Sequence, residues 1–362
     1  MTNLRQFKPI FGLRVEGQPF NASRVMKIEV TDAAGYESDE LTIEFDDVFP
    51  HIEKPREGAA ITLELGFAET GLIFAGTYLF EEWERNGFQR TATLVAKAAD
   101  HAKSLKEPKT RAWTGTVETI TQTIAHAHNL KLVISDALRA HQIDYLAQTE
   151  ESDQHFLTRL GRRIGAVIAP KDGHLLVTER YSGKTASGED LPRIHITLDQ
   201  LISSSAYSLR LKPRSRFAKI IAKWEDAACG KTRQVILDLA VEGPSITLRE
   251  VLQNGADALK AAQARQKEAR AGEGELTIAL VGDPEARAEA PILIAGVAPD
   301  VDGEWLAHSV THVWDFGAEG GATTTIEAQF GMEDDDKPAE PSASPKNGTA
   351  TGNGEYISIL DR

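Results

Sequence analysis

The chain has 362 residues, of which 41% are hydrophobic and 26% charged, the composition of an ordinary globular protein. Since this length exceeds one compact domain, we expect two or three domains. Forty Lys and Arg residues against 54 Asp and Glu give a formal charge of -14, which argues against nucleic-acid binding as the primary role. A single cysteine, Cys229, excludes an intramolecular disulfide framework and a multi-cysteine zinc site.

No apolar run approaches the ~20 residues that a membrane helix needs, and the first residues, MTNLRQFKPI, contain no apolar core of a signal peptide. The sequence therefore predicts a chain that is made in the cytosol and does not bind a membrane by itself.

Residues 1–99 are expected to form a small antiparallel barrel or sandwich. From residue 24 onward apolar side chains recur at every second position, as Leu41, Ile43 and Phe45 do in LTIEFDD. This alternation is typical of strands that bury one face. Asn86 and Gly87, between two such runs, predict a hairpin turn.

The apolar period changes in residues 100–195, which are predicted to form an α+β module. In GTVETITQTIAHAHNL, apolar residues recur three and four positions apart, Thr116 can cap the start of a helix and Asn129 can close its end. A second helix is expected in QTEESDQHFLTRLGRRIGA, with Ser152 as N-cap, Asp153 in the first turn and Gly165 as the left-handed terminal residue. The apolar stripe of this helix comprises Phe156, Leu157, Leu160 and Ile164.

Three arginines, Arg159, Arg162 and Arg163, extend toward the carboxyl end of this second helix. They have two interpretations: a site for a phosphate or carboxylate, or exposed ion pairs that complement the helix dipole. For Arg162 and Arg163 the second interpretation is preferred.

Alternation resumes in residues 196–332, which are predicted to be a second strand-rich domain. An Ala-rich segment, ADALKAAQARQKEARAG, interrupts it, and because Leu259 is its one large apolar side chain we expect an exposed helix. From Glu333 the chain is acidic and rich in Pro, Ser and Gly, which predicts a disordered linker. The final YISILDR is apolar again, so we expect a tethered docking strand rather than a mobile end; its apolar residues are Tyr356, Ile357, Ile359 and Leu360.

Motifs for catalysis lack required positions. SGKT and CGKT resemble phosphate-binding loops, but Thr178 and Glu225 stand where each needs glycine. DVDGEW has Trp305 where a calcium loop needs glycine. His308 and His312 lie on a predicted strand, where four residues separate them by roughly 13 Å. The sequence therefore predicts no catalytic residue, no metal and no cofactor.

The motif Q-x-x-E-S-D-x-x-F-L-x-R-L-x-x-x-x-G resembles the signature of the phage late control D family, the baseplate hub proteins of contractile tails, which are related to the amino-terminal part of type VI secretion spike proteins. It consists of Gln148, Glu151, Ser152, Asp153, Phe156, Leu157, Arg159, Leu160 and Gly165. The segments GYESDELTIEFDD, EGAAITLELGF and FAGTYLFEEWE resemble the family's first barrel, and LTIALVGDPEARAEAPILIAGVAPDVDGEWLAHSVTHVWD resembles its closing barrel. The resemblance covers residues 8–332.

This resemblance implies a mainly β fold in which 1–99 and 196–332 are tube-like antiparallel β-barrels and 100–195 is an inserted α+β module. It further implies a structural homotrimer whose six barrels match the hexameric tail tube and join it to a central spike protein. Other baseplate proteins and the tape-measure protein would be further partners, and DNA would pass only transiently through a neutral to acidic channel. The location would be the virion tail baseplate, assembled in the host cytoplasm.

Two other classes stay open on the residues alone. A tail-tip cell-wall hydrolase would need distant carboxylates to converge. A surface-glycan binding module would need an exposed aromatic platform, which the tryptophans would have to supply: Trp83, Trp113, Trp224, Trp305 and Trp314.

Overall fold

The computed structural model describes residues 7–20, 22–35, 39–98, 104–171, 173–212, 216–226, 229–317 and 320–330. The predicted acidic linker and the docking segment with Tyr356, Ile357, Ile359 and Leu360 lie outside these residues. In the described part of the chain, no helix has the length and apolarity that crossing a membrane requires.

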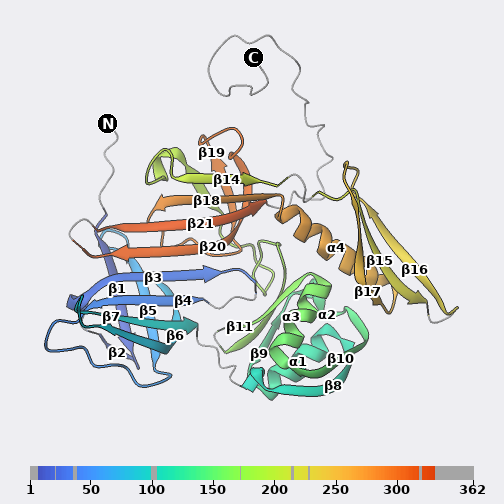
Figure 1. Cartoon of the computed structure of the whole chain (residues 1–362), viewed down its shortest axis with the longest axis horizontal. Helices are drawn as coiled ribbons and strands as arrows, with labels where there is room; N and C mark the ends of the chain where they lie inside the picture. The colour runs from blue at the N-terminus through green and yellow to red at the C-terminus, as the bar shows by residue number, and fades with distance from the viewer. Residues whose placement is uncertain are drawn as a thin grey trace, which may run out of the picture. The chain divides into compact units, whose positions relative to one another are not determined.

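The largest element of the fold is a continuous 13-stranded sheet, built from the two strand-rich segments (Figure 1). Its first half contains β1 (Pro9–Val15), β2 (Gln18–Pro19), β3 (Val25–Ala33), β4 (Glu40–Asp46), β5 (Ala60–Phe67), β6 (Gly71–Asn86) and β7 (Thr91–Ala98). Its second half contains β13 (Ile194–Thr197), β14 (Tyr207–Leu211), β18 (Gly274–Val281), β19 (Pro291–Ala295), β20 (Gly303–Asp315) and β21 (Ala322–Phe330). Each half surrounds its own hydrophobic core.

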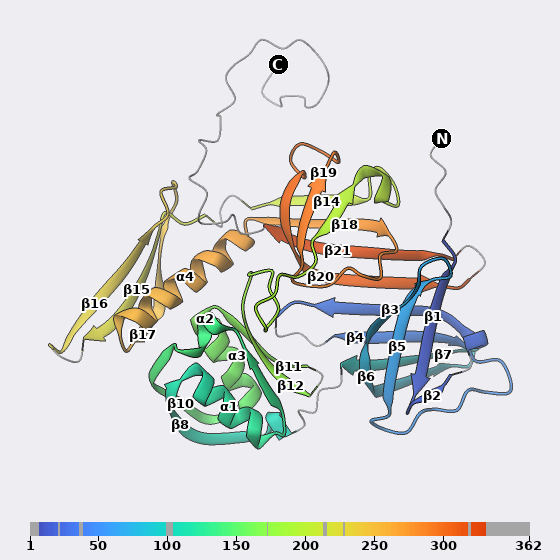
Figure 2. The same cartoon turned by 180° about the vertical axis from the view of Figure 1, so that it is seen from behind.

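Strand β20 joins the two halves of the sheet (Figure 2). Its first residues pair with β19, its last residues pair with β3, and β21 runs along nearly its whole length. The register with β21 shifts between Ala307 and Ser309, so His308 is the extra residue of a bulge. The predicted strand over His308 and His312 is thus confirmed.

The bulge keeps the buried side chains of β20 on one side of the sheet along the whole strand. Trp305 and Ala307 are buried before it, and Val310 and Trp314 are buried after it. In a regular strand the inward positions would continue at odd numbers, so residues 310 and 314 would face the other side. One extra residue reverses that alternation, and both cores receive side chains from the same strand.

The α+β module contains a two-stranded and a three-stranded sheet, and its two long helices contact strands of both. Its elements are β8 (Pro108–Thr116), α1 (Val117–Ala127), β9 (Lys131–Ile134), α2 (Asp136–Arg139), β10 (Gln142–Ser152), α3 (Asp153–Ile164), β11 (Ala166–Lys171) and β12 (His174–Glu179). The predicted caps of α1 are present, because the Thr116 hydroxyl accepts the Thr119 N–H and Asn129 adopts a positive φ of 56°. Strand β10, which holds the first residues of the signature motif, was not predicted.

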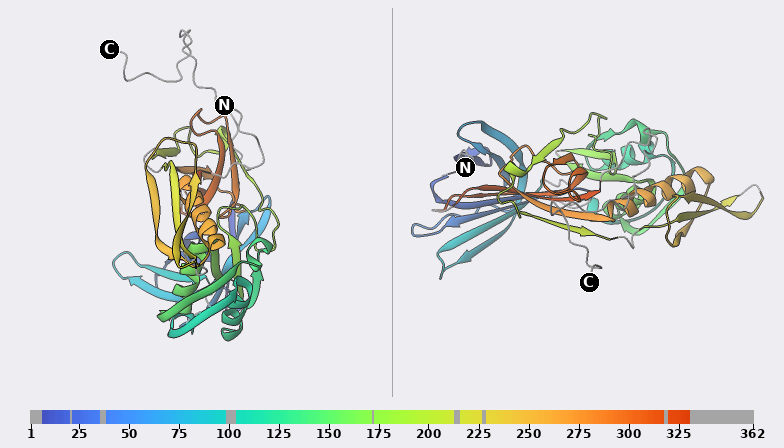
Figure 3. Two further views of the ribbon diagram at one scale, coloured as in Figure 1. Left: turned by 90° about the vertical axis from the view of Figure 1, so that its right-hand side faces the viewer. Right: turned by 90° about the horizontal axis from the view of Figure 1, so that it is seen from above.

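A separate three-stranded sheet with its own small core lies within the second strand-rich segment, packed against helix α4 (Figure 3). It consists of β15 (Lys219–Asp226), β16 (Lys231–Asp238) and β17 (Ser245–Leu252), and α4 spans Gly255–Ala271. The prediction that this helix is exposed is wrong. Ala258, Ala261 and Ala262 are buried against the sheet, whereas Leu259 is 40% exposed. Alanine side chains let the helix backbone approach the strands closely, so a stripe of small residues is sufficient to form the contact.

Trp314 provides a test of the shared strand. Its side chain is fully buried in the core of the first half, its Nε1–H donates to the Gly66 carbonyl at 3.2 Å, and its ring lies 5.8 Å from that of Phe67. Trp314→Ala should lower the free energy of unfolding by about 3–5 kcal/mol, because it leaves a large cavity. Urea unfolding followed by circular dichroism measures this loss.

Phe88→Ala is the control for this experiment. Phe88 is 98% exposed, so its removal should change stability by less than about 0.5 kcal/mol. A Trp314→Ala variant as stable as the Phe88→Ala variant would contradict the role assigned to Trp314.

Candidate functional site

Helix α3, which carries most of the signature motif, is fixed at both ends by its own sequence. The Ser152 hydroxyl accepts the His155 N–H at 3.2 Å, and Gly165 has a φ of 70°, the left-handed conformation that ends the helix. The apolar stripe, Phe156, Leu157, Leu160 and Ile164, is buried in the module's core. A helix with these features is held rigidly, which suits a structural role.

Asp153, the first residue of α3, is a fully buried carboxylate with four side-chain donors. Lys109 Nζ and His128 Nε2 lie 2.6 and 2.8 Å from Oδ2. Arg111 and the Gln148 amide donate to Oδ1 at 2.5 and 2.8 Å. The donors come from β8, from the C-cap of α1 and from β10, so one charge connects three elements to the start of α3.

The pKa of Asp153 reflects two opposing effects. Burial by itself would raise it, but the hydrogen bonds from Lys109, Gln148, His128 and Arg111 outweigh burial and hold the pKa well below its usual range. Asp153 is therefore a permanent anion at neutral pH and has no proton to exchange. This state fits a structural anchor and excludes a role as general acid.

Gln148 extends the network into the core. Its buried side-chain oxygen accepts Trp113 Nε1–H at 2.9 Å and Arg111 Nε–H at 3.1 Å. Its amide nitrogen donates to the Glu151 carbonyl at 2.8 Å as well as to Asp153. All hydrogen-bonding groups of this amide are thus occupied, which is the condition for burying it at low cost.

Arg159 and Glu151 form the outer part of the same junction. The guanidinium donates to both carboxylate oxygens of Glu151, at 3.1 and 2.7 Å, and to the Ala147 carbonyl at 2.7 Å. The central guanidinium carbon of Arg159, Cζ, lies 5.5 Å from the centre of the Phe156 ring. The structure therefore brings the polar residues of the motif together at the β10–α3 junction, and its apolar residues lie beneath them.

Arg163 links α3 to α4, and the prediction that it is exposed is wrong. It is 9% exposed and pairs with Asp257, in the first turn of α4, and with Glu250 at 3.2 Å. His141 lies 3.0 Å from the other oxygen of Asp257. Burial favours a raised pKa for Asp257, but hydrogen bonds from His141 and Arg163 lower it. The side chain is buried because α4, expected at the surface, packs over it. Arg162, by contrast, is exposed as predicted.

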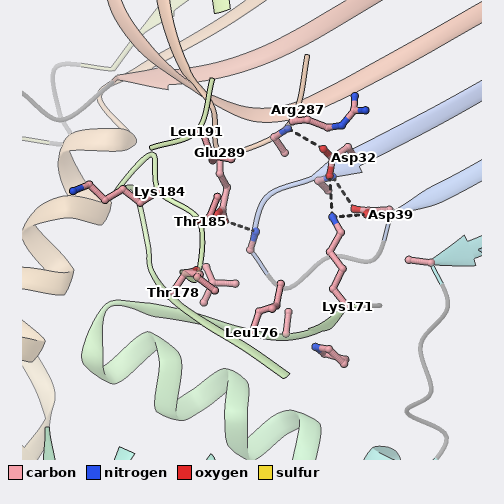
Figure 4. A pocket seen from close by; sticks show the side chains of 18 of the residues that line it. Asp32, Asp39, Lys171, Leu176, Thr178, Lys184, Thr185, Leu191, Arg287 and Glu289 are labelled. Carbon is pink, nitrogen blue, oxygen red and sulfur yellow. Dashed lines mark hydrogen bonds and ion pairs between the residues drawn. The ribbon is translucent and has the colours of Figure 1, made fainter. Parts of the chain in front are cut away.

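A cavity of about 340 Å³, lined by apolar side chains and a cluster of charged ones, lies where the first half of the sheet, the α+β module and the segment before β19 meet (Figure 4). Lys171, at the end of β11, lies 3.0 Å from Asp39 and 3.7 Å from Asp32. The Gly35 N–H donates to Glu289 at 3.3 Å. Burial, together with the negative charge of Asp32, raises the pKa of Asp39 and that of Glu289.

The chemistry available in this cavity is limited. The Thr185 hydroxyl lies 2.8 Å from that of Ser187 and accepts the Glu189 N–H, so it is not paired with a general base. Asp32 accepts a hydrogen bond from the Ala288 N–H at 3.0 Å, and its carboxylate therefore stabilises the backbone of the segment before β19. Among the described residues, no group of three His, Cys, Asp or Glu side chains is arranged to hold a metal ion. The arrangement is one of ion pairs that connect neighbouring segments.

Sequence reasoning missed the cations around Asp153. Lys109, Arg111 and Trp113 alternate along β8 and point to the same face of the strand, a pattern that was available in the sequence. His128 stands two positions from His126 at the end of a predicted helix, where the two side chains point to different faces, so their spacing indicates no shared site. The partner of His128 is 25 residues away in the chain, and no local pattern indicates that contact.

Comparison with curated proteins identifies two relatives that match nearly the full length of this chain. A probable baseplate hub protein of Escherichia phage 186 is 27% identical in a match that covers 92% of this chain and 95% of that protein. A probable baseplate hub protein of Escherichia phage P2 is 26% identical in a match that covers 86% of this chain and 90% of that protein. No protein-family model matches.

Solved structures with similar folds include the 43 kDa tail protein of prophage MuSo2 from Shewanella oneidensis. It has a TM-score of 0.66 at 17% identity and covers 89% of this chain and 98% of that one. A type VI secretion component of E. coli, described as similar to phage T4 tail proteins gp27 and gp5, has a TM-score of 0.54 at 13% identity. The match covers 89% of this chain and 77% of that one. The predicted mainly β fold and the predicted resemblance to baseplate hub proteins are both confirmed.

Asp153→Asn tests the buried network. The substitution keeps the shape of the side chain and removes its charge, which leaves Lys109 and Arg111 around an uncharged group. At neutral pH we expect the free energy of unfolding to fall by about 3 kcal/mol, as measured by urea unfolding. Glu151→Gln, which weakens the partly exposed pair with Arg159, is the matched control and should cost less than about 1 kcal/mol.

The pH dependence gives a second readout of Asp153. Because its folded-state pKa is lowered from the ordinary 3.8, its contribution to stability is complete above that value and is lost as the pH falls toward the folded-state pKa. Stability measured from neutral pH downward should therefore fall more steeply for the unmodified chain than for Asp153→Asn. Parallel curves would show that the charge of Asp153 contributes nothing.

Proposed function

We propose that this chain is the structural hub of a contractile-tail baseplate, a trimeric adaptor between the tail tube and a central spike. The observation that carries the proposal is the similarity, over nearly the full length of both chains, to the probable baseplate hub proteins of phages 186 and P2. The structural similarity to phage tail proteins and to a type VI secretion component agrees with it.

The proposed trimer rests on the resemblance to the baseplate hub family, and the presence of two strand-rich halves in one sheet is compatible with it. We propose that residues 1–99 and 196–332 form two tube-like units and that 100–195 is the module between them. Three copies would then present six such units to a hexameric tube, and closed rotational symmetry would complete the ring. The continuous sheet through β20 supports this proposal, since it would hold both units of one chain at a fixed angle.

The proposed partners are the tail tube protein, the central spike protein and other baseplate proteins, including the tape-measure protein. DNA would cross the ring without being held, because a passage for DNA must not bind phosphate tightly, and the formal charge of -14 agrees with this requirement. The ring would assemble in the host cytoplasm and reside in the virion tail. We propose that the chain catalyses no reaction itself, a view supported by its incomplete motifs and by the hydrogen bonds within the module that occupy Asp153.

Electron cryomicroscopy of native particles tests the proposed stoichiometry. We expect three copies of this chain per ring, with the two sheet halves of each copy placed one sixth of a turn apart. The tail tube protein of the same particles is the internal control and should show six copies per ring. Six copies of this chain in one ring would overturn the trimer.

The C-terminal segment with Tyr356, Ile357, Ile359 and Leu360 is proposed to dock as an added strand on a neighbouring subunit or on the spike. Its β-favouring apolar side chains and the Pro-, Ser- and Gly-rich composition of residues 333–354 support this proposal. Deleting residues 355–362 should leave thermal unfolding of the hub unchanged and reduce its co-purification with the spike. Deletion of residues 343–350 is the control, because it shortens the tether and keeps the apolar segment. Unchanged assembly after the first deletion would rule out docking.

A further inference from the structure

A groove of about 590 Å³ between α3, β17 and α4 gathers positive charge, and it shares no residue with the cavity of Figure 4. Five arginines and three glutamates line it, an excess of two positive charges in a chain of formal charge -14. The arginines are Arg159, Arg162, Arg163, Arg249 and Arg265. They come from three different elements, so the fold and not one basic run brings them together.

The arginines of the groove differ in how strongly they are engaged. Arg163 is buried against Asp257, and its side chain serves the contact between α3 and α4. Arg159 and Arg265 each pair with a glutamate on the wall, Glu151 at 2.7 Å and Glu268 at 2.5 Å. Arg162 and Arg249 are exposed; Arg162 makes an interaction of its own within the chain, and among the described residues no ion pair involves Arg249. The groove therefore presents guanidinium groups to a ligand as well as to its own walls.

A bulge in β17 directs part of that strand to the groove. The register with β15 passes from Thr247, opposite Ile221, to Val251, opposite Lys223. Residues 248–250 are therefore left without a partner in that register, and all three line the groove. Bulges re-aim side chains and recur next to functional sites. This one places Arg249 opposite α3.

The floor of the groove is apolar. Leu248, Leu252 and Ala261 line it and belong to, or pack against, the small core under α4. A floor of this kind can cover the aliphatic part of a peptide while the rim binds its charges. A free inorganic anion would make no use of it.

We propose that this groove binds a short carboxylate-rich segment of a partner protein, with Arg162 and Arg249 as the principal contacts. Guanidinium groups bind carboxylates through paired hydrogen bonds, which gives direction as well as charge. A cavity of this size accommodates a few peptide residues. A nucleic-acid backbone fits less well, because Glu151, Glu250 and Glu268 would repel successive phosphates. The inference does not depend on the baseplate role.

Fluorescence anisotropy of a labelled pentapeptide of alternating glutamate and valine, titrated with the full chain, tests the proposal. Binding should be saturable and should weaken as the salt concentration rises. The double variant Arg162→Glu, Arg249→Glu should bind about tenfold more weakly or worse, since both exposed contacts become repulsive. Glu268→Gln releases Arg265 from its pair, so it should bind the peptide more tightly than the unmodified chain.

Lys231→Glu is the control for each of the two substitutions, because it makes one such charge reversal on β16, outside the groove, and should leave peptide affinity unchanged. Unaltered affinity in the double variant overturns the proposal, as does equal binding of a lysine–valine peptide. Tighter binding of a single-stranded oligonucleotide of equal charge would identify the groove as a nucleic-acid site instead. If the double variant changes the oligomeric state without peptide, as measured by sedimentation velocity, the groove is a contact between copies and the proposal is wrong.

Discussion

The alternation of side chains along a β-strand is the constraint on which this fold depends, because β20 has to supply two hydrophobic cores. Trp305 stacks on Phe330 in one core, and Trp314 packs beside Phe67 in the other. An uninterrupted strand would turn one of these groups toward the wrong side. The extra residue at His308 removes the conflict locally, and the paired strands β3 and β21 follow on either side. Two units that share one strand cannot hinge freely, and this rigidity agrees with the ring adaptor proposed above.

Each end of helix α3 takes part in a buried ion pair. The pair at its start lies within the α+β module, and the pair at its end connects the module to α4. Asp153 gathers Lys109, Arg111 and His128 within the module, so its network fixes how β8, α1 and β10 meet. Arg163 instead reaches outward to Asp257 of α4. Buried ion pairs often add little net stability compared with apolar packing, but an unpaired buried charge is costly. Wrong arrangements of these elements would leave such charges unpaired, so the networks select this arrangement over others of similar hydrophobic content.

The sequence was sufficient for the elements whose signals are local. Alternation located most strands of the large sheet, although β1, β2, β13 and β14 were not predicted. Thr116, Ser152 and Gly165 located helix ends, because capping depends on residues three or four positions apart. The apolar half of the signature motif was likewise read as the buried face of α3. The order of the strands was not accessible, since β3 and β20 are paired across more than two hundred residues. The burial of α4 was missed because the search for an apolar stripe gives little weight to alanine. Alanine nevertheless packs closely against a sheet, because its small side chain lets the two backbones approach. The contacts of Asp153 and Asp257 with their cationic partners were missed because each contact joins segments that are distant in the chain.

The titration behaviour of the buried carboxylates follows from what surrounds each of them. At the cavity, burial and mutual repulsion raise the pKa of Asp39 and of Glu289, so each charge costs stability at neutral pH, and that cost disappears as the pH falls through the raised value. At α3 the donors lower the pKa of Asp153 and of Asp257, so their stabilisation is present at neutral pH and is lost only at lower pH. Acidification therefore relieves the junction around Lys171 first and weakens the anchors of α3 afterwards. The neutral-pH fold thus combines firmly anchored elements with one junction at which charge opposes packing, and that junction lies between the segments whose relative placement would set the geometry of a ring.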